Sequence, residues 1–168
     1  NVLLEDQRFN EIFSDDLRNI IRSADFSFVN LETPVIADNL EPIAKYGPSL
    51  KCTPQGIQAI KYAGFTGVTM ANNHILDYGI EGLAETIKSC RSEQLDIVGV
   101  GGNLKEAESI LYLAKDDVRL AIINCCEHEF SAATLNSPGA NPLNPVRQYY
   151  SIQQAREIAD YVLVIVHG

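Results

Sequence analysis

Two consecutive amides and a histidine, Asn72-Asn73-His74, follow a short β-prone run at residues 64–70. Asp77 stands three residues after the histidine, where a carboxylate can hold an imidazole in one orientation. Open α/β sheets bind ligands at the carboxyl ends of their strands, which is where these groups lie. The same residues also suit a polar turn, with Asn side chains bonding local backbone and Asp77 capping the next helix. The spacing therefore indicates a metal or anion site, with a capped loop as the alternative.

Polar side chains also end three other predicted strands, at residues 26–31, 118–126 and 161–166. They are Asn30, Glu32, Glu127, His128, Glu129 and His167. If the strands are mostly parallel, their carboxyl ends meet at one edge and these loops converge. Each has an ordinary alternative: Glu32 as a solvated acid, Asn30 as a turn residue, and residues 127–129 as a polar loop.

The chemistry of this set follows from its donor atoms. A carboxylate, an amide oxygen and a neutral imidazole suit Mn²⁺, Fe, Zn²⁺ or Mg²⁺, and the set lacks the thiolates of structural zinc. Glu32 can bridge two ions, Asn73 can bind through its amide oxygen and His167 through its ring. Two ions about 3.5–4 Å apart can clamp a phosphate and activate water. His74 would then donate a proton to the leaving-group oxygen, with Asp77 raising its basicity.

The elements that must position these residues alternate between helix and strand, which predicts an α/β fold. We expect helices at 14–23, 54–63, 81–93, 104–109 and 151–158, the last from a Ser151–Gln154 capping box. We expect strands at 26–31, 65–70, 96–100, 110–115, 118–126 and 161–166, with a hairpin at Asp116-Asp117 and a buried final strand. The segment Gly99-Val100-Gly101-Gly102 lacks the full dinucleotide fingerprint, so a Rossmann fold is rejected.

Composition bounds the function classes. The 168 residues suffice for one domain with a sizeable core. The net charge of −9 argues against a non-specific nucleic-acid binder and gives no attraction to anionic lipid. The cysteines show no CxxC spacing, which predicts buried free thiols and slightly favours a reducing compartment; they are Cys52, Cys90, Cys125 and Cys126. There is no run of 18 apolar residues, and the first residues do not resemble a signal peptide.

Four segments together resemble the bacterial CapA family of capsule-synthesis proteins, which is linked to poly-gamma-glutamate and belongs to the calcineurin-like metallophosphoesterase superfamily. They are NLETP (30–34), ANNHILDYG (71–79), GVGGN (99–103) with Glu106-Ala107, and VIVHG (164–168). The first two motifs are specific, and the glycine segment is supportive only. The resemblance runs through nearly the whole chain.

The resemblance implies an αββα sandwich with two divalent metal ions between the loops at the strand ends. In it Glu32 matches the bridging acid, Asn73 the amide ligand, His74 the catalytic histidine and His167 a late metal ligand. Asn30, Asn72, Glu127 and Glu129 are expected to line the site. The family usually starts with a strand that carries a Gly-Asp ligand and continues past His-Gly to an acidic residue. We therefore expect residues 1–168 to form one partial domain, truncated at both ends and lacking two ligands.

The leading functional hypothesis is a metal-dependent hydrolase of phosphoester-type bonds in capsule synthesis, acting on an anionic polymer or phosphoester in the bacterial cytoplasm or cell envelope. The alternative is a non-catalytic component of polymer assembly or export that binds an anionic glutamate polymer or a partner protein, because fold alone does not decide function. A third hypothesis is an amide hydrolase that uses the same metals on a gamma-glutamyl bond.

Overall fold

Two three-stranded sheets form the centre of the molecule. The computed structural model describes residues 2–37, 40–127 and 129–168. The first sheet is parallel and has the order β1 (Phe28–Asn30), β2 (Gly67–Thr69), β3 (Asp96–Val98). The second has the order β5 (Leu111–Lys115), β6 (Val118–Cys126), β8 (Tyr161–His167), with β5 antiparallel and β8 parallel to β6. A short antiparallel pair, β4 (Val100–Gly101) and β7 (Gly139–Ala140), stands beside them.

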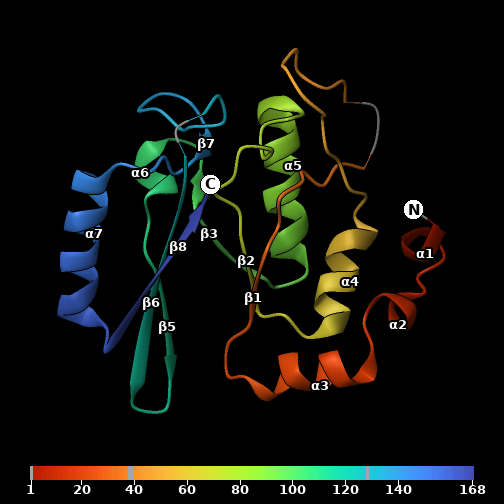
Figure 1. Cartoon of the computed structure of the whole chain (residues 1–168), viewed down its shortest axis with the longest axis horizontal. Coiled ribbons are helices and arrows are strands. Elements are labelled where there is room, and N and C mark those ends of the chain that lie inside the picture. Colours follow the sequence, from red (N-terminus) through yellow and green to blue (C-terminus); the bar gives the residue numbers. More distant parts are fainter. Residues whose placement is uncertain (1, 38–39, 128) are drawn as a thin grey trace.

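Helices cover the outer faces of both sheets. They are α1 (Val2–Glu5), α2 (Phe9–Ile12), α3 (Asp15–Ser23), α4 (Gln55–Ala63), α5 (Gly79–Ser92), α6 (Leu104–Ala107) and α7 (Pro145–Ile158). In Figure 1, α4 and α5 flank the first sheet and α7 flanks the second on the opposite side of the molecule. The order helix, sheet, sheet, helix is the expected αββα arrangement.

Two apolar clusters hold these layers together. The larger joins the first sheet to α4 and α5 through Val68, Met70, Ile57 and Leu83, and it includes Cys126 of β6. The smaller packs α7 on β6 and β8 through Ala121, Ile123, Ala155 and Ala159. Successive residues of a strand face opposite sides, so alternate residues of β6 face α7 and the first sheet. This alternation lets β6 join both clusters.

Asn124 of β6 connects the two sheets by hydrogen bonds. Its side chain is buried, and its Oδ1 accepts from the backbone N–H of Ala71, which follows β2, at 2.7 Å. Its Nδ2 donates to the backbone oxygen of Ile165 in β8 at 3.1 Å. The residue therefore fixes the start of the 71–77 loop relative to the end of β8.

We expect Asn124→Leu to lower the free energy of unfolding by about 2–4 kcal/mol, because it leaves the buried Ala71 N–H without its acceptor and removes the bond to the partly buried Ile165 oxygen. Urea denaturation measures the loss. The matched control is Asn136→Leu at an exposed loop position, which should change stability by less than about 0.5 kcal/mol. Equal losses in the two variants would contradict the bridging role.

Most predicted elements are present, but two expectations are wrong. Helix α7 begins at Pro145 rather than near Ser151, because the Asn144 side chain accepts from the N–H groups of Val146 and Arg147 and Pro145 occupies the first turn. Strand β8 is not buried: Tyr161 is 66% exposed and Leu163 45%. As the edge strand of its sheet, β8 packs one face on α7 and leaves much of the other open.

The cysteines are free thiols, as expected. Cys90, Cys125 and Cys126 are buried and Cys52 is partly buried. Burial raises the pKa of Cys90 to about 12 and is the main reason that the pKa of Cys126 rises to about 11. Both therefore stay protonated near neutral pH. In the three described segments, no helix is both long and apolar enough to cross a membrane.

Candidate metal centre

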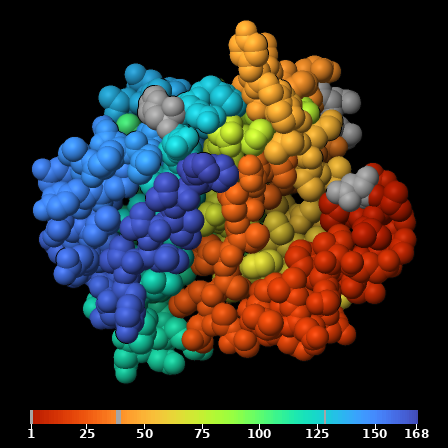
Figure 2. Space-filling view, viewed as in Figure 1, coloured from red at the N-terminus to blue at the C-terminus, as the bar shows by residue number. Residues whose placement is uncertain are grey.

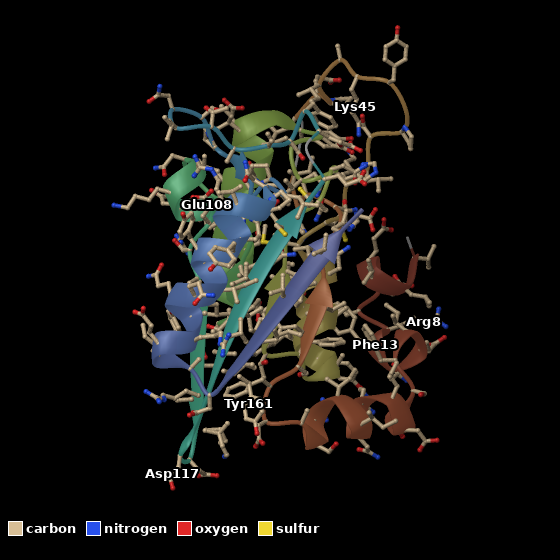
Figure 3. All side chains as sticks on the ribbon, turned by 60° about the vertical axis from the view of Figure 1, so that its left-hand side comes forward. Arg8, Phe13, Lys45, Glu108, Asp117 and Tyr161 are labelled. Atoms are coloured by element: carbon tan, nitrogen blue, oxygen red, sulfur yellow. The ribbon has the colours of Figure 1, made fainter. Side chains whose placement is uncertain are left out.

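The carboxyl ends of β1, β2 and β8 meet at one end of the molecule. In Figure 3 the arrowheads of β1, β6 and β8 point toward the end that carries Lys45, whereas Asp117 lies at the opposite end. The parallel pairing of β1 with β2 and of β6 with β8 gives each sheet one shared carboxyl edge. Polar residues that follow these strands are therefore brought into one region.

Glu32, Asn73 and His167 converge there from three separate strand ends. The Nε2 atom of His167 lies 3.2 Å from Asn73 Oδ1 and 4.0 Å from Glu32 Oε1. Two donor atoms bound to one ion at about 2.1 Å are roughly 3–4.2 Å apart, so these spacings fit a shared divalent ion. Among the described residues, no three His, Cys, Asp or Glu side chains form such a group alone. The Asn73 amide is the third donor of the set.

A cavity of about 420 Å³ surrounds these three side chains. Its lining also includes Cys126, Glu127, Glu129 and Gly168. The Glu127 N–H donates to the His167 backbone oxygen at 3.0 Å, which fixes Glu127 against the end of β8. The cavity thus adds the carboxylates of Glu127 and Glu129 to that of Glu32, and we call it the acidic cavity. His128, which the sequence also suggested, lies outside the described residues.

The other candidate amides take different positions. Asn30 lies beside the site, with its Nδ2 3.4 Å from Glu32 Oε2, and is outside the lining of the acidic cavity. Asn72 is fully buried: its Nδ2 donates to the Leu31 and Met70 oxygens, and its Oδ1 accepts from the His74 N–H. The structure therefore gives Asn72 a role in shaping the loop, and only Asn73 of the pair lines the cavity.

His74 and Asp77 form a close pair. Nδ1 of His74 lies 2.8 Å from Oδ2 of Asp77, and such a contact requires a proton between them. The ring therefore donates from Nδ1, which leaves Nε2 for proton transfer to a ligand. Helix α5 begins after Tyr78 with no side-chain cap, so Asp77 orients His74 rather than capping the helix. Its Oδ2 also accepts from the Leu50 N–H at 2.7 Å.

Lys45 completes this group, although no motif in the sequence pointed to it. Its ammonium forms an ion pair with Asp77 Oδ1 and lies 3.3 Å from His74 Nδ1. The Lys45 side chain is only 9% exposed, and Asp77 is fully buried. The buried carboxylate is therefore matched by a buried cation. The only available signal was a lysine within a Pro- and Gly-containing loop, which does not reveal a contact with a residue so distant in sequence.

A second cavity, of about 530 Å³, opens on the His74 side of the acidic cavity. Its lining includes segment 43–48, Phe130 and His74. Asn73 and Glu129 line both cavities. A ligand that spans the two would therefore place its reacting group between the candidate metal ligands and His74.

The profile of a known family, described as bacterial capsule synthesis protein PGA_cap, matches residues 2–168. The chain belongs to this family. The match confirms the resemblance drawn from the NLETP and ANNHILDYG motifs.

Several named bacterial proteins are similar to this chain over most of its length. The capsule biosynthesis protein CapA of Bacillus anthracis is 32% identical over 155 residues, which cover 88% of this chain and 38% of that protein. The PGA biosynthesis protein CapA of Bacillus subtilis is 31% identical over 151 residues, covering 88% and 40%. A probable polyglutamine synthesis accessory protein of Mycobacterium tuberculosis is 28% identical over 123 residues, covering 70% and 32%. The chain thus spans about two fifths of the length of the two CapA proteins.

A solved structure has the same fold. It is a putative 5′-nucleotidase from Staphylococcus aureus in complex with alpha-ketoglutarate, with a TM-score of 0.55 and 16% identity over 90% of this chain and 31% of that one. At this identity the likeness concerns the fold alone. It confirms the metallophosphoesterase-like αββα fold that the resemblance implied.

Proposed function

We propose that this PGA_cap chain contributes to a divalent-metal centre that hydrolyses a phosphoester-type bond during the synthesis of a capsule polymer. The observation that carries the proposal is the convergence of Glu32, Asn73 and His167, with the His167 Nε2 atom 3.2 Å from Asn73 Oδ1 and 4.0 Å from Glu32 Oε1. The names of the Bacillus relatives support a role in capsule or PGA biosynthesis. Two ions, each Mn²⁺, Fe, Zn²⁺ or Mg²⁺, suit the mixed oxygen and nitrogen donors.

The positions of the residues in the two cavities indicate the role of each in the reaction. The bound ions would supply Lewis acidity toward the phosphoryl oxygens and lower the pKa of water. Asn73 and Glu129 line both cavities and so mark where the phosphoryl group would lie. His74, held by Asp77 through Nδ1, passes a proton from Nε2 to the leaving-group oxygen. The water oxygen forms a bond to phosphorus and gives up a proton to solvent, the ester phosphorus–oxygen bond breaks, and the alcohol leaves with the proton from His74.

The proposal is tested by Glu32→Gln in the full-length protein. The variant keeps the size of the side chain and removes the negative charge, so we expect Mn²⁺ affinity to fall at least about tenfold and phosphoester hydrolysis to fall with it. Equilibrium dialysis followed by elemental analysis gives the affinity. A chromogenic phosphoester assay with Mn²⁺ gives the activity.

The control is Glu157→Gln, which removes a carboxylate from the exposed face of α7. It should bind Mn²⁺ and turn over substrate as the parent protein does. Unchanged Mn²⁺ affinity in Glu32→Gln would refute the metal assignment. Normal metal binding without cleavage of any phosphoester would instead favour the non-catalytic role in polymer assembly, and cleavage of a gamma-glutamyl bond would favour the amide hydrolase.

A further inference from the structure

The second cavity, next to His74, has walls from two segments that are far apart in sequence. Residues 43–48, Phe130 and His74 all line it. In Figure 2 the light-orange segment near residues 40–50 stands above the rest of the molecule at this end. The cavity is therefore built by a projecting segment that has no part in the candidate metal ligands.

Asp77 fastens this segment to the body of the protein. The Ile43 N–H donates to the Asp77 backbone oxygen at 2.9 Å, and the Leu50 N–H donates to Oδ2 at 2.7 Å. The Lys45 ammonium binds Oδ1. The residue that orients His74 thus also fixes the wall of the cavity beside it. The geometry of the wall and the direction of the imidazole are set by one buried carboxylate.

The lining of the cavity favours uncharged, apolar groups. Ile43, Pro48 and Phe130 offer hydrocarbon surface, and the Phe130 ring is 46% exposed. The one ammonium in the lining, on Lys45, is bound to Asp77 and lies 5.1 Å from the centre of the Phe130 ring. It is thus already paired, and the Glu129 carboxylate in the lining repels an anionic leaving group that, unlike the phosphoryl group, has no metal ion to neutralise it. A carboxylate would find no unpaired cation among these lining residues.

We propose that this cavity is the subsite for the leaving group of the substrate, and that it takes an apolar or aromatic alcohol in preference to a carboxylate-bearing one. This inference rests on the proposed function, because it places the phosphoryl group at Asn73 and the departing oxygen at His74. An aromatic ring in the cavity stacks on Phe130 and removes apolar surface from water. The site thus selects among phosphate esters by the alcohol that departs.

The test compares three phosphate esters of primary alcohols, whose intrinsic reactivities are similar: ethyl phosphate, 2-phenylethyl phosphate and the phosphate ester of 3-hydroxypropanoate. In the full-length protein with Mn²⁺ we expect kcat/KM for the phenylethyl ester to exceed that for the ethyl ester at least tenfold. The carboxylate ester should be the poorest substrate. Phe130→Ala should reduce the phenylethyl preference to about threefold or less.

Two further variants separate the cavity from general effects. Ile43→Ser, at another apolar lining residue, should also weaken the phenylethyl preference. Leu135→Ala removes a 74% exposed side chain that lines neither cavity, and should leave the preference unchanged. Equal rates for the ethyl and phenylethyl esters, a preference for the carboxylate ester, or an unchanged preference in Phe130→Ala would each overturn the inference.

A binding measurement keeps this inference distinct from the proposed function. Titration calorimetry with ethylphosphonate and 2-phenylethylphosphonate, which are not hydrolysed, should show at least tenfold tighter binding of the phenylethyl compound in the presence of Mn²⁺. If no ester is cleaved but this difference is found and is lost in Phe130→Ala, the hydrolase and the leaving-group role fail, and only the apolar binding preference of the cavity stands. If esters are cleaved without discrimination, the hydrolase stands and the subsite fails.

Discussion

His74→Ala is expected to lower kcat for ethyl phosphate by about 10²–10⁴-fold, the usual contribution of a positioned acid–base group. The imidazole lines the second cavity, and its Nδ1 is held by Asp77 at 2.8 Å, so Nε2 is the atom that can serve the leaving oxygen. An alkoxide is a poor leaving group and needs that proton. Steady-state kinetics of the full-length protein with Mn²⁺ measure the effect.

A second substrate, whose leaving group needs no proton, is the control for this prediction. With 4-nitrophenyl phosphate the leaving group departs without protonation, so the same variant should lose at least tenfold less activity than with ethyl phosphate. Mn²⁺ affinity should stay within about threefold of the parent value, because His74 is not among the converging ligands. Equal losses for both esters would show that His74 acts in some other way.

Asp77→Ala is expected to lower the free energy of unfolding by about 3–5 kcal/mol, the usual result of removing one partner of a buried ion pair. The variant leaves the Lys45 ammonium without its counter-charge in a site where its side chain is 9% exposed. It also removes the acceptor of the Leu50 N–H. Urea denaturation followed by circular dichroism gives the value.

A double-mutant cycle tests whether the ion pair is the reason. The Lys45→Met substitution removes the cation that Asp77→Ala would strand, so the double variant should be less destabilised than the sum of the single variants by at least 1 kcal/mol, of the order seen for contacting residues. Lys51→Met is the matched control. Lys51 Nζ lies 5.5 Å from the centre of the Tyr78 ring, outside the Lys45–Asp77–His74 group, so its substitution should add to Asp77→Ala independently. Additivity at Lys45 would contradict the pairing.

Elements with local signals could be predicted from the sequence. The hairpin across Asp116-Asp117 and the helix after Ser14 were expected, and the structure confirms both, with the Ser14 side chain accepting from the Leu17 N–H. The start of α7 was missed because two capping signals compete in one stretch. Asn144-Pro145 caps earlier than Ser151, and the additional turns of the longer helix bury Gln148. Packing decided between two local options that the sequence could not rank.

In the site, too, some features could be predicted from the sequence and others could not. Parallel strands bring their carboxyl ends together, so the meeting of Glu32, Asn73 and His167 could be anticipated from order and spacing. Lys45 and Asn124 could not, because each acts through a contact with a residue far along the chain. The choice between Asn72 and Asn73 also needed the fold. The packing of the loop decides which of the two adjacent amides is buried in the protein and which lines the acidic cavity.

The candidate ligands come from both sheets, since Glu32 and Asn73 follow β1 and β2 whereas His167 ends β8. An ion bound by Glu32, Asn73 and His167 would link the two sheets, next to the hydrogen bonds that Asn124 makes between them. Occupancy and folding would then be thermodynamically linked: an ion at a hundred times its dissociation constant adds about 2.7 kcal/mol to the native state. Resistance to heat would in that case report on how much free divalent ion the surroundings provide.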